Sequence, residues 1–288
     1  MENNQVLRLA IQKSGRLHEE SFRLLKACGI DVQNGGGKLR SVATNFPLEV
    51  FYLRDDDIPQ YVEEGVADCG IAGQNVVLEK GKTVTEEQCL GFGRCRLSLA
   101  VPKGKEYRGI GDFQGRNIAT SYPVILRDFL TKNGVDAGIR QISGSVEIAP
   151  GIGLADGICD IVSSGSTLLS NGLREVEVVM KSEAVLIASP TLDTGKKVLL
   201  EQLLFRIRAL NAARRNKYIL LNAPNEKIPD IARILPGMKS PTVMPLQEPG
   251  WSSIHTVVQE DRFWEIIEDL KACGAQGILV APIEKMIL

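Results

Sequence analysis

The sequence predicts an α/β protein built from two similar lobes and a smaller C-terminal module. Strand-like apolar runs alternate with helical patterns along most of the chain, a rhythm that is typical of largely parallel sheets. A Gly-x-x-Asp-x-x-x-x-Gly pattern occurs twice, at Gly65–Gly73 and Gly157–Gly165. The last part of the chain reads strand, helix, strand, strand, helix, strand, which is the ferredoxin-like split motif. At 288 residues, the chain is long enough for two or three domains.

The N-terminal segments show this alternation directly. The expected elements are a strand at Val6–Ile11, a helix from Leu17 to Cys28, a strand at Leu48–Leu53, a helix at Ile58–Glu64 and a strand within Gly65–Gly73. We expect Asp57 to cap the second helix, because Pro59 follows in the first turn, where a missing N–H does no harm. This capping role is favoured over a metal site formed by Asp55, Asp56 and Asp57.

The repeated glycine pattern predicts the domain organisation. Each copy follows a predicted helix, contains a short apolar strand and ends at a glycine turn, so each is expected to form the centre of one lobe. Leu97–Val101 and Glu177–Ala188 would be the strands that cross between the lobes. Lobe I would therefore be discontinuous, residues 1–98 and 181–209, with lobe II inserted at residues 99–180. The alternative is that so short a pattern recurs by chance.

The C-terminal region, residues 210–288, has its own rhythm after an amphipathic helix at Lys197–Asn211. Its expected elements are strands at Tyr218–Leu221, Pro241–Leu246, Trp251–Val258 and Gln276–Ile283, with helices at Ile228–Leu235 and Asp261–Lys271. The second of these helices should turn Phe263, Trp264, Ile267 and Leu270 inward. Modules of this shape often pair through their sheets and bind small regulatory ligands, by analogy.

Composition limits the classes of function. A formal net charge of -1 argues against a nucleic-acid or anionic-membrane partner recruited by bulk charge. No apolar run is long enough to span a bilayer, and the N-terminus lacks the features of a secretory signal, so a cytoplasmic location is expected. The six cysteines form no C-x-x-C pair, which favours reduced thiols over a zinc site.

The segment Asp160–Leu168 carries the strongest functional signal. It places one carboxylate at the end of an apolar strand, followed by a hydroxyl-rich turn containing Gly165 and the start of a helix. Such a turn presents several N–H and O–H groups to one anion, and an ionised Asp can accept hydrogen bonds from a sugar diol. A phosphate beside a ribose is a phosphoribosyl group. A tight strand-to-helix turn with an N-capping serine is an equally acceptable interpretation.

Motifs along the chain resemble those of the ATP phosphoribosyltransferase family. The most specific is the segment Glu147–Leu168, which holds Gly153, Ala155, Ile158, Asp160, Ile161, Ser164, Gly165, Thr167 and Leu168 at the family's spacing. Shorter matches are Lys13–Leu17, Leu53–Pro59, Asp68–Gly73, Arg116–Pro123, Ser240–Thr242 and Gly274-Ala275. The resemblance runs from Leu7 to Lys285, and the C-terminal module is that of the family's long form, which carries its own regulatory domain.

This resemblance implies a fold and a reaction. The fold is two lobes of the type seen in periplasmic binding proteins, forming a cleft, plus a ferredoxin-like regulatory domain. In the reaction, N1 of the ATP adenine attacks C1 of phosphoribosyl pyrophosphate, and pyrophosphate leaves. Mg²⁺ is expected on the diphosphate. This is the first step of histidine biosynthesis, inhibited by histidine, and the family assembles as dimers and hexamers.

The resemblance also implies roles for individual residues. Asp160, Glu147 and Arg16 are the expected catalytic residues, and Glu147 is also a possible magnesium ligand. Phosphoribosyl pyrophosphate would contact Asp160, Ser163, Ser164, Gly165, Ser166, Thr167 and Leu168. ATP would contact Lys13, Arg16, Arg54, Asp68, Gly73 and Tyr122. Each charged residue could instead be a solvated surface group, Arg54 could pair with Asp55–Asp57, and Asp68 could cap the turn after its own strand.

Histidine is expected to bind in the C-terminal module, near Asn222, Ser240 and Thr242. The family pattern at the first position is often acidic, so Asn222 is a departure, and all three residues could equally serve turns and strand ends. An alternative function is that of a two-lobed binding protein for small anions or amino acids. The absence of a secretory signal or a helix-turn-helix motif argues against it.

Overall fold

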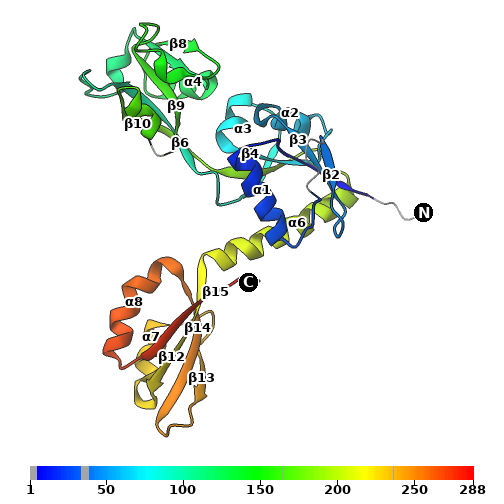
Figure 1. The fold of residues 1–288 in the computed structure, drawn as a ribbon, viewed down its shortest axis with the longest axis vertical. Helices are drawn as coiled ribbons and strands as arrows, with labels where there is room; N and C mark the ends of the chain where they lie inside the picture. The colour runs from blue at the N-terminus through cyan, green and yellow to red at the C-terminus, as the bar shows by residue number, and fades with distance from the viewer. Residues whose placement is uncertain (1–4, 34–38, 164, 236) are drawn as a thin grey trace. The chain divides into compact units, whose positions relative to one another are not determined.

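The computed structural model describes residues 5–33, 39–163, 165–235 and 237–288. The chain divides into two compact units, Met1–Gln202 and Leu203–Leu288. In the described residues, the first unit contains a six-stranded and a five-stranded sheet, and the second contains a four-stranded sheet (Figure 1). A single helix, α6 (Thr194–Arg214), contains the boundary between the units. The predicted α/β class with a small C-terminal sheet is confirmed.

Lobe I is formed by the six-stranded sheet, which joins two distant parts of the chain in the order β2-β3-β1-β4-β11-β5. Its strands are β1 (Leu7–Gln12), β2 (Arg40–Val42), β3 (Leu48–Leu53), β4 (Cys69–Gly73), β5 (Thr85–Cys89) and β11 (Ala184–Ala188). Its helices are α1 (Arg16–Ala27), α2 (Ile58–Glu63) and α3 (Gln74–Lys80), with the 3-10 turn η1 (Asp55–Asp57) before α2. Strands β3, β1 and β4 run parallel, and their apolar side chains are buried except Phe51 and Leu53 of β3, which are partly buried. The strand at β5 was not anticipated, because its residues are mostly polar.

Lobe II is formed by the five-stranded sheet, in the order β10-β6-β9-β7-β8. Its strands are β6 (Cys95–Pro102), β7 (Asn117–Thr120), β8 (Gly138–Gln141), β9 (Gly157–Val162) and β10 (Leu173–Ser182). Its helices are α4 (Pro123–Lys132) and α5 (Ser166–Ser170), and η2 (Ile110–Phe113) and η3 (Val146–Ile148) are 3-10 turns. Gly157 lies under Phe113, whose ring would be 2.7 Å from an added Cβ, so this close approach requires glycine.

The two lobes share one strand order. In each, three parallel strands are arranged as second, first, third along the chain, which gives β3-β1-β4 in lobe I and β8-β7-β9 in lobe II. An antiparallel strand then flanks the third, β11 beside β4 and β6 beside β9. The chain crosses between the sheets twice, between β5 and β6 and between β10 and β11 (Figure 1). The two-lobed interpretation therefore agrees with the fold.

The repeated glycine pattern, however, is aligned incorrectly. Asp68 accepts a hydrogen bond from the backbone N–H of Arg8 at the start of β1. The residue that does the same in lobe II is Asp156, which accepts from the N–H of Asn117 at the start of β7. The structural counterpart of Asp68 is therefore Asp156, not Asp160. The repeat is real in the fold, but the spacing that suggested it is coincidental.

The second unit has the predicted βαββαβ order. Its elements are β12 (Asn216–Pro224), η4 (Asn225–Lys227), α7 (Ile228–Ile234), β13 (Thr242–Pro245), β14 (Trp251–Gln259), α8 (Glu260–Ala272) and β15 (Gln276–Pro282). The strands pair antiparallel as β13-β14-β12-β15. Its core contains Leu270 and Ile266 of α8, but Trp264 is 75% exposed, so its inward placement was wrong. A helical stripe can be shifted by one position when several neighbouring residues are apolar.

The predicted cap at Asp57 is also wrong. Asp57 occupies the position before α2, but its side chain makes no capping hydrogen bond. The three aspartates instead form the turn η1, which continues into α2 at Ile58. Pro59 lies in the first turn of α2, as expected.

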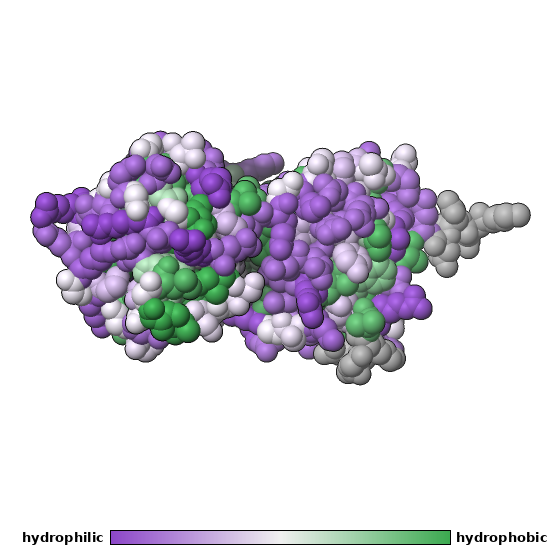
Figure 2. Space-filling model, turned by 90° about the horizontal axis from the view of Figure 1, so that it is seen from above, coloured by the Kyte–Doolittle hydropathy of each residue, from purple (hydrophilic) through white to green (hydrophobic). Residues whose placement is uncertain are grey.

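The face of the molecule in Figure 2 is mainly hydrophilic, with apolar side chains gathered in a few separate groups. Across the described part of the chain, no helix is long and apolar enough to cross a membrane.

Candidate functional site

The carboxyl ends of β7 and β9 form one edge of lobe II. The two strands are parallel neighbours, and the pairing of Thr120 with Cys159 places Asp160 at that edge beside the residues that follow β7. Helices begin after the strands at this edge, which is where ligands bind in open α/β sheets. The segments expected to hold the phosphoribosyl group therefore lie on the appropriate edge.

The turn after β9 has the backbone of a tight strand-to-helix connection. Gly165 precedes α5 with φ 81°, a left-handed conformation that favours glycine. Leu168 is buried and anchors the turn, whereas Ser163, Ser166 and Thr167 are exposed. The N-cap position is held by Gly165 without a side-chain hydrogen bond, so the N-capping serine is not observed. Ser164 lies outside the described residues.

Two carboxylates lie close together beside this turn. Burial raises the pKa of Asp160, and the nearby charge of Glu147 raises it further, against the opposing hydrogen bond from the N–H of Ile161. Glu147 is held by the turn η3, which begins after Ser145 in a left-handed conformation, φ 51°. Among the described residues, Ser145 is the only non-glycine with positive φ. Such backbone strain is concentrated at functional sites.

This pair of carboxylates suits hydroxyl groups or a cation. Carboxylate oxygens are preferred ligands of Mg²⁺, which usually keeps several waters and binds through one or two carboxylates plus substrate phosphates. No group of three or more His, Cys, Asp or Glu side chains is arranged to hold a metal within the described ranges. Asp160 and Glu147 therefore fit a magnesium ion that arrives with a phosphate, and not a closed protein cage.

Tyr122 lies at the same edge, directly before α4. Burial raises the pKa of its phenol, and the charge of Asp160 adds to the effect. The side chain of Asn75 of α3, in the other lobe, opposes this rise and so lies near the phenol. The structure thus brings Tyr122 toward the proposed ribose carboxylate, at a contact between the lobes.

Three predicted cations are grouped at the carboxyl edge of lobe I. Gln12 pairs with Leu53 in parallel register, so Lys13 and Arg54 leave the sheet side by side. Arg16 begins α1 after the turn at Gly15, and its exposed guanidinium forms a long ion pair of 3.6 Å with Glu20. Gly73 ends β4, the strand on the other side of β1, at this edge.

Asp68 is located elsewhere. It precedes β4, at the amino end of the strand, and its side chain is 4% exposed. Its Oδ1 lies 2.9 Å from Nη2 of Arg8 and 2.8 Å from Nζ of Lys196. Burial opposes ionisation, but these hydrogen bonds keep the pKa of Asp68 below its usual range. Its charge is therefore already satisfied, at the edge of the sheet opposite the cations, which argues against a contact with the nucleotide.

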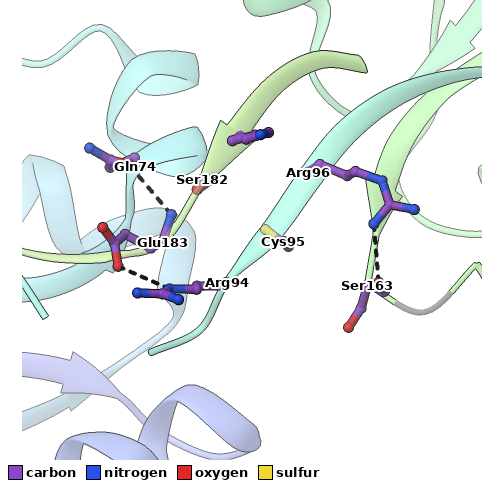
Figure 3. A pocket seen from close by; sticks show the side chains of 8 residues that line it. Gln74, Arg94, Cys95, Arg96, Ser163, Ser182 and Glu183 are labelled. Atoms are coloured by element: carbon purple, nitrogen blue, oxygen red, sulfur yellow. Dashed lines mark hydrogen bonds and ion pairs between the residues drawn. The ribbon is translucent and has the colours of Figure 1, made fainter. Parts of the chain in front are cut away.

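A basic cavity of about 570 Å³ lies where the chain crosses between the lobes (Figure 3). Its lining residues include Gln74, Arg94, Arg96, Ser163, Lys181 and Glu183. Arg94 ion-pairs with Glu183 at 3.6 Å, and Arg96 makes a bidentate pair with Glu175 at 2.5 Å. Arg96 also donates to the backbone carbonyl of Ser163, at 3.3 Å, and so holds the start of the turn after β9.

Sequence reasoning missed these cavity residues, except Ser163. Their signal was the basic residues in and beside the two crossing strands, with Arg96 in β6, Arg94 directly before it and Lys181 in β10. An ionised group on a half-buried strand needs a partner, and here the partners are carboxylates and a backbone carbonyl.

The three histidine-site candidates lie in the second unit. Asn222 pairs with Ser253 of β14, and Thr242 pairs with His255 two residues further on, so both point to one face of the sheet. Ser240 is exposed, just before β13. The imidazole of His255 hydrogen-bonds with the hydroxyls of Ser253 and Tyr218, at 3.0 and 2.8 Å. These residues form a polar row on one face of the four-stranded sheet.

A titratable carboxyl lies behind the site, in η1. Burial raises the pKa of Asp55 to about 6, the charge of Asp56 contributes, and Lys80 opposes the shift. One oxygen of Asp55 is buried without a hydrogen-bond partner. Because the folded state binds this proton more tightly than the unfolded chain, the stability of the fold decreases as pH rises from about 4 to 6, and the cost remains above pH 6.

We therefore expect Asp55→Asn to stabilise the protein at pH 8 by about 2–3 kcal/mol, since a shift of about two pKa units corresponds to this energy. The gain should disappear near pH 3, where Asp55 is mostly protonated in both states. Urea unfolding at the two pH values measures it. The control is Asp56→Asn, whose side chain is 69% exposed and should change stability by less than about 0.5 kcal/mol. A loss of stability in Asp55→Asn at pH 8 would contradict this account.

Comparisons with known proteins identify relatives of the whole chain. A family model described as ATP phosphoribosyltransferase matches residues 54–209, and one described as HisG, C-terminal domain, matches residues 213–285. The chain is 61% identical over 282 residues to "ATP phosphoribosyltransferase" of Cytophaga hutchinsonii, which covers 98% of this chain and 99% of that protein.

Solved structures support the same relationship. A chain of the "ATP phosphoribosyl transferase (HisG:HisZ) complex from Thermotoga maritima" has a TM-score of 0.61 and 29% identity, covering 70% of this chain and 96% of that chain. A histidine kinase sensor domain with similarity to periplasmic binding proteins has a TM-score of 0.50 and 10% identity, covering 73% and 92%, and shows the fold alone.

Proposed function

Because the chain belongs to the ATP phosphoribosyltransferase family, we propose that Asp160 and the turn Ser163–Leu168 bind the phosphoribosyl group of its substrate. The chain is an ATP phosphoribosyltransferase, which transfers phosphoribosyl from phosphoribosyl pyrophosphate to N1 of ATP and releases pyrophosphate. This reaction is the first step of histidine biosynthesis. The alternative of a non-catalytic binding protein is not favoured.

The proposal rests on one observation: Asp160, Glu147 and an exposed turn rich in hydroxyl groups lie together at one edge of lobe II. In the proposed complex, Asp160 accepts hydrogen bonds from the ribose hydroxyls. The 5-phosphate is held by N–H and O–H groups of Ser163, Ser164, Gly165, Ser166, Thr167 and Leu168. Glu147 faces the same ribose or its magnesium ion. Mg²⁺, when bound to the diphosphate, neutralises charge on the leaving group. Kinetics and substrate binding of an Asp160→Asn variant test this assignment.

The proposed ATP contacts are the cations of lobe I. Lys13, Arg16 and Arg54 stand together at the carboxyl edge of the sheet, where an anionic phosphate chain would be neutralised, and arginine binds phosphate oxygens in pairs. Arg94 and Lys181 of the basic cavity add positive charge beside the phosphate turn. Tyr122 is the proposed contact of the adenine.

The reaction requires little acid–base chemistry. Adenine N1 already has a lone pair and carries no proton to remove, and pyrophosphate is a capable leaving group. The protein's task is to hold two polyanions in line and to stabilise charge as the C–O bond breaks. The raised pKa of Asp160 fits this task, because its carboxylate is stabilised once hydroxyl donors or a cation arrive.

We propose that the protein is cytoplasmic and assembles as a homo-oligomer, a dimer or hexamer, through the second unit. One face of its sheet is covered by α7 and α8, whereas Tyr218, Met244 and Leu279 on the strands remain 40–62% exposed. Apolar side chains on an uncovered sheet face are typical of an interaction surface.

Histidine is the proposed inhibitor, bound beside Asn222, Ser240 and Thr242. We expect Asn222→Ala to raise the histidine concentration for half-inhibition by about tenfold, because one hydrogen bond to a charged ligand is worth about 1.5 kcal/mol or more. The uninhibited kcat should stay unchanged. The measurement follows the ultraviolet absorbance of N1-alkylated adenine, with pyrophosphatase present, while histidine is titrated. Unchanged inhibition in this variant would remove Asn222 from the site.

A further inference from the structure

The contact between helices α3 and α4 joins the two lobes through hydrogen bonds. The carboxylate of Glu79, near the end of α3, accepts from the backbone N–H of Val124 at 3.0 and 3.2 Å and from that of Ile125 at 3.1 Å. These are N–H groups of the first turn of α4, which have no partner within their own helix. A lobe I side chain therefore caps a lobe II helix.

One turn earlier on α3, Asn75 makes a second connection. Its side chain accepts a hydrogen bond from the hydroxyl of Ser182 at 2.8 Å, and the same hydroxyl accepts from the N–H of Asn75 at 3.1 Å. Ser182 ends β10, where the chain crosses back to lobe I. Asn75 also lies near the phenol of Tyr122, the residue directly before α4, and opposes the rise that burial causes in its pKa. Residues 75 and 79 are four apart, so both lie on one face of α3.

Apolar packing contributes little to this contact. Leu78 of α3 and Val124 of α4 are 51% and 53% exposed, although both line the same side of the junction. A cavity of about 420 Å³ lies there, bordered also by Ile125, Phe129 and Met180. With so much apolar surface still open, the relative position of the lobes depends on the polar contacts of Glu79 and Asn75.

We propose that Glu79 and Asn75 are positioning residues for phosphoribosyl transfer. They fix the N-terminus of α4, and with it Tyr122 beside Asp160, relative to the cations of lobe I. Because each lobe holds one substrate in the site proposed above, on which this inference rests, the junction sets the alignment of adenine N1 with C1 of the ribose. Small misplacements of reacting groups lower the rate strongly, even when each substrate still binds.

Steady-state kinetics and direct binding on the full chain test this role. We expect Glu79→Ala to lower kcat about tenfold, while the Kd of phosphoribosyl pyrophosphate, measured by calorimetry, changes less than twofold because its turn lies wholly in lobe II. Glu79→Gln keeps an oxygen acceptor and should restore part of the loss, to about threefold below the unchanged protein. The control is Glu64→Gln, an exposed carboxylate of the same lobe, which should leave kcat unchanged.

A double-mutant cycle tests the second connection. Asn75→Ala and Tyr122→Phe should each lower kcat, and the double variant should lose less than the product of the single losses, because both remove the same contact between α3 and the residue before α4. The role of the junction is overturned if Glu79→Ala retains full kcat or gains activity, or if kcat and substrate affinity fall together. Full activity in Asp160→Asn would overturn the proposed phosphoribosyl site instead, so the two failures are distinguishable.

Discussion

Replacing Asp160 by Asn should lower kcat/KM for phosphoribosyl pyrophosphate by about 10²–10³-fold. The ionised carboxylate is proposed to accept two hydroxyl hydrogen bonds, and bonds to a charged acceptor are worth about 1.5–3 kcal/mol each. Asn keeps the shape and one acceptor oxygen but loses the charge. The stability of the fold should not decrease, because burial and Glu147 already raise the pKa of Asp160 and so disfavour its charged form. The ultraviolet assay for N1-alkylated adenine and a thermal melt measure the two effects.

The control is Asp128→Asn, a carboxylate of the same lobe whose side chain is 61% exposed and pairs only with Lys132 in the next turn of its helix. In this variant, kcat and KM for phosphoribosyl pyrophosphate should stay within twofold of those of the unchanged protein. Thr167→Ala should weaken substrate binding by a smaller factor, because it removes one hydroxyl and keeps the N–H groups of the turn. Unchanged turnover in both Asp160→Asn and Thr167→Ala would show that the phosphoribosyl site lies elsewhere.

The strand-to-helix turn after Asp160 could be predicted from the sequence because its residues are contiguous, whereas its binding of a phosphate stays a prediction. A strand, an acid, a glycine with positive φ and a run of hydroxyls are contiguous, and the fold only has to place them at a strand end. The same holds for Lys13 and Arg54, which directly follow their strands. Lys13 and Arg54 lie side by side because their two strands are parallel neighbours in the sheet.

The residues that the sequence did not reveal act across large separations. Glu79 meets Val124, 45 residues away, and Ser182 meets Asn75, 107 residues away. Such contacts depend on how two lobes face each other, which periodicity does not encode. Arg96, whose partners Glu175 and Ser163 come from other strands, belongs to the same class. The predicted bounds of lobe II, residues 99–180, and of the C-terminal domain, residues 210–288, stay predictions. The arrangement of strands into sheets does not define the first and last residue of a lobe.

The misaligned repeat has a thermodynamic consequence for Asp68 and Asp156. Both cap the amino end of a central strand, but Asp68 is almost fully buried between Arg8 and Lys196, whereas the side chain of Asp156 is 39% exposed beside Lys105. Removing one member of a buried ion pair leaves the other charge uncompensated and costs about 3–5 kcal/mol. A half-exposed pair is worth about 1 kcal/mol or less.

Asp68→Ala should therefore destabilise the first unit by about 3–5 kcal/mol, and Asp156→Ala by about 1–2 kcal/mol, including the lost backbone hydrogen bond. Urea unfolding at pH 7.5 measures both, and Asp68→Asn should lie between the two because it keeps one acceptor for the N–H of Arg8. Since the carboxylate of Asp68 is satisfied at the edge opposite the cations, KM for ATP of the folded Asp68→Asn variant should stay within twofold. A raised KM for ATP with unchanged stability would instead place Asp68 in contact with the nucleotide, as the sequence pattern had suggested.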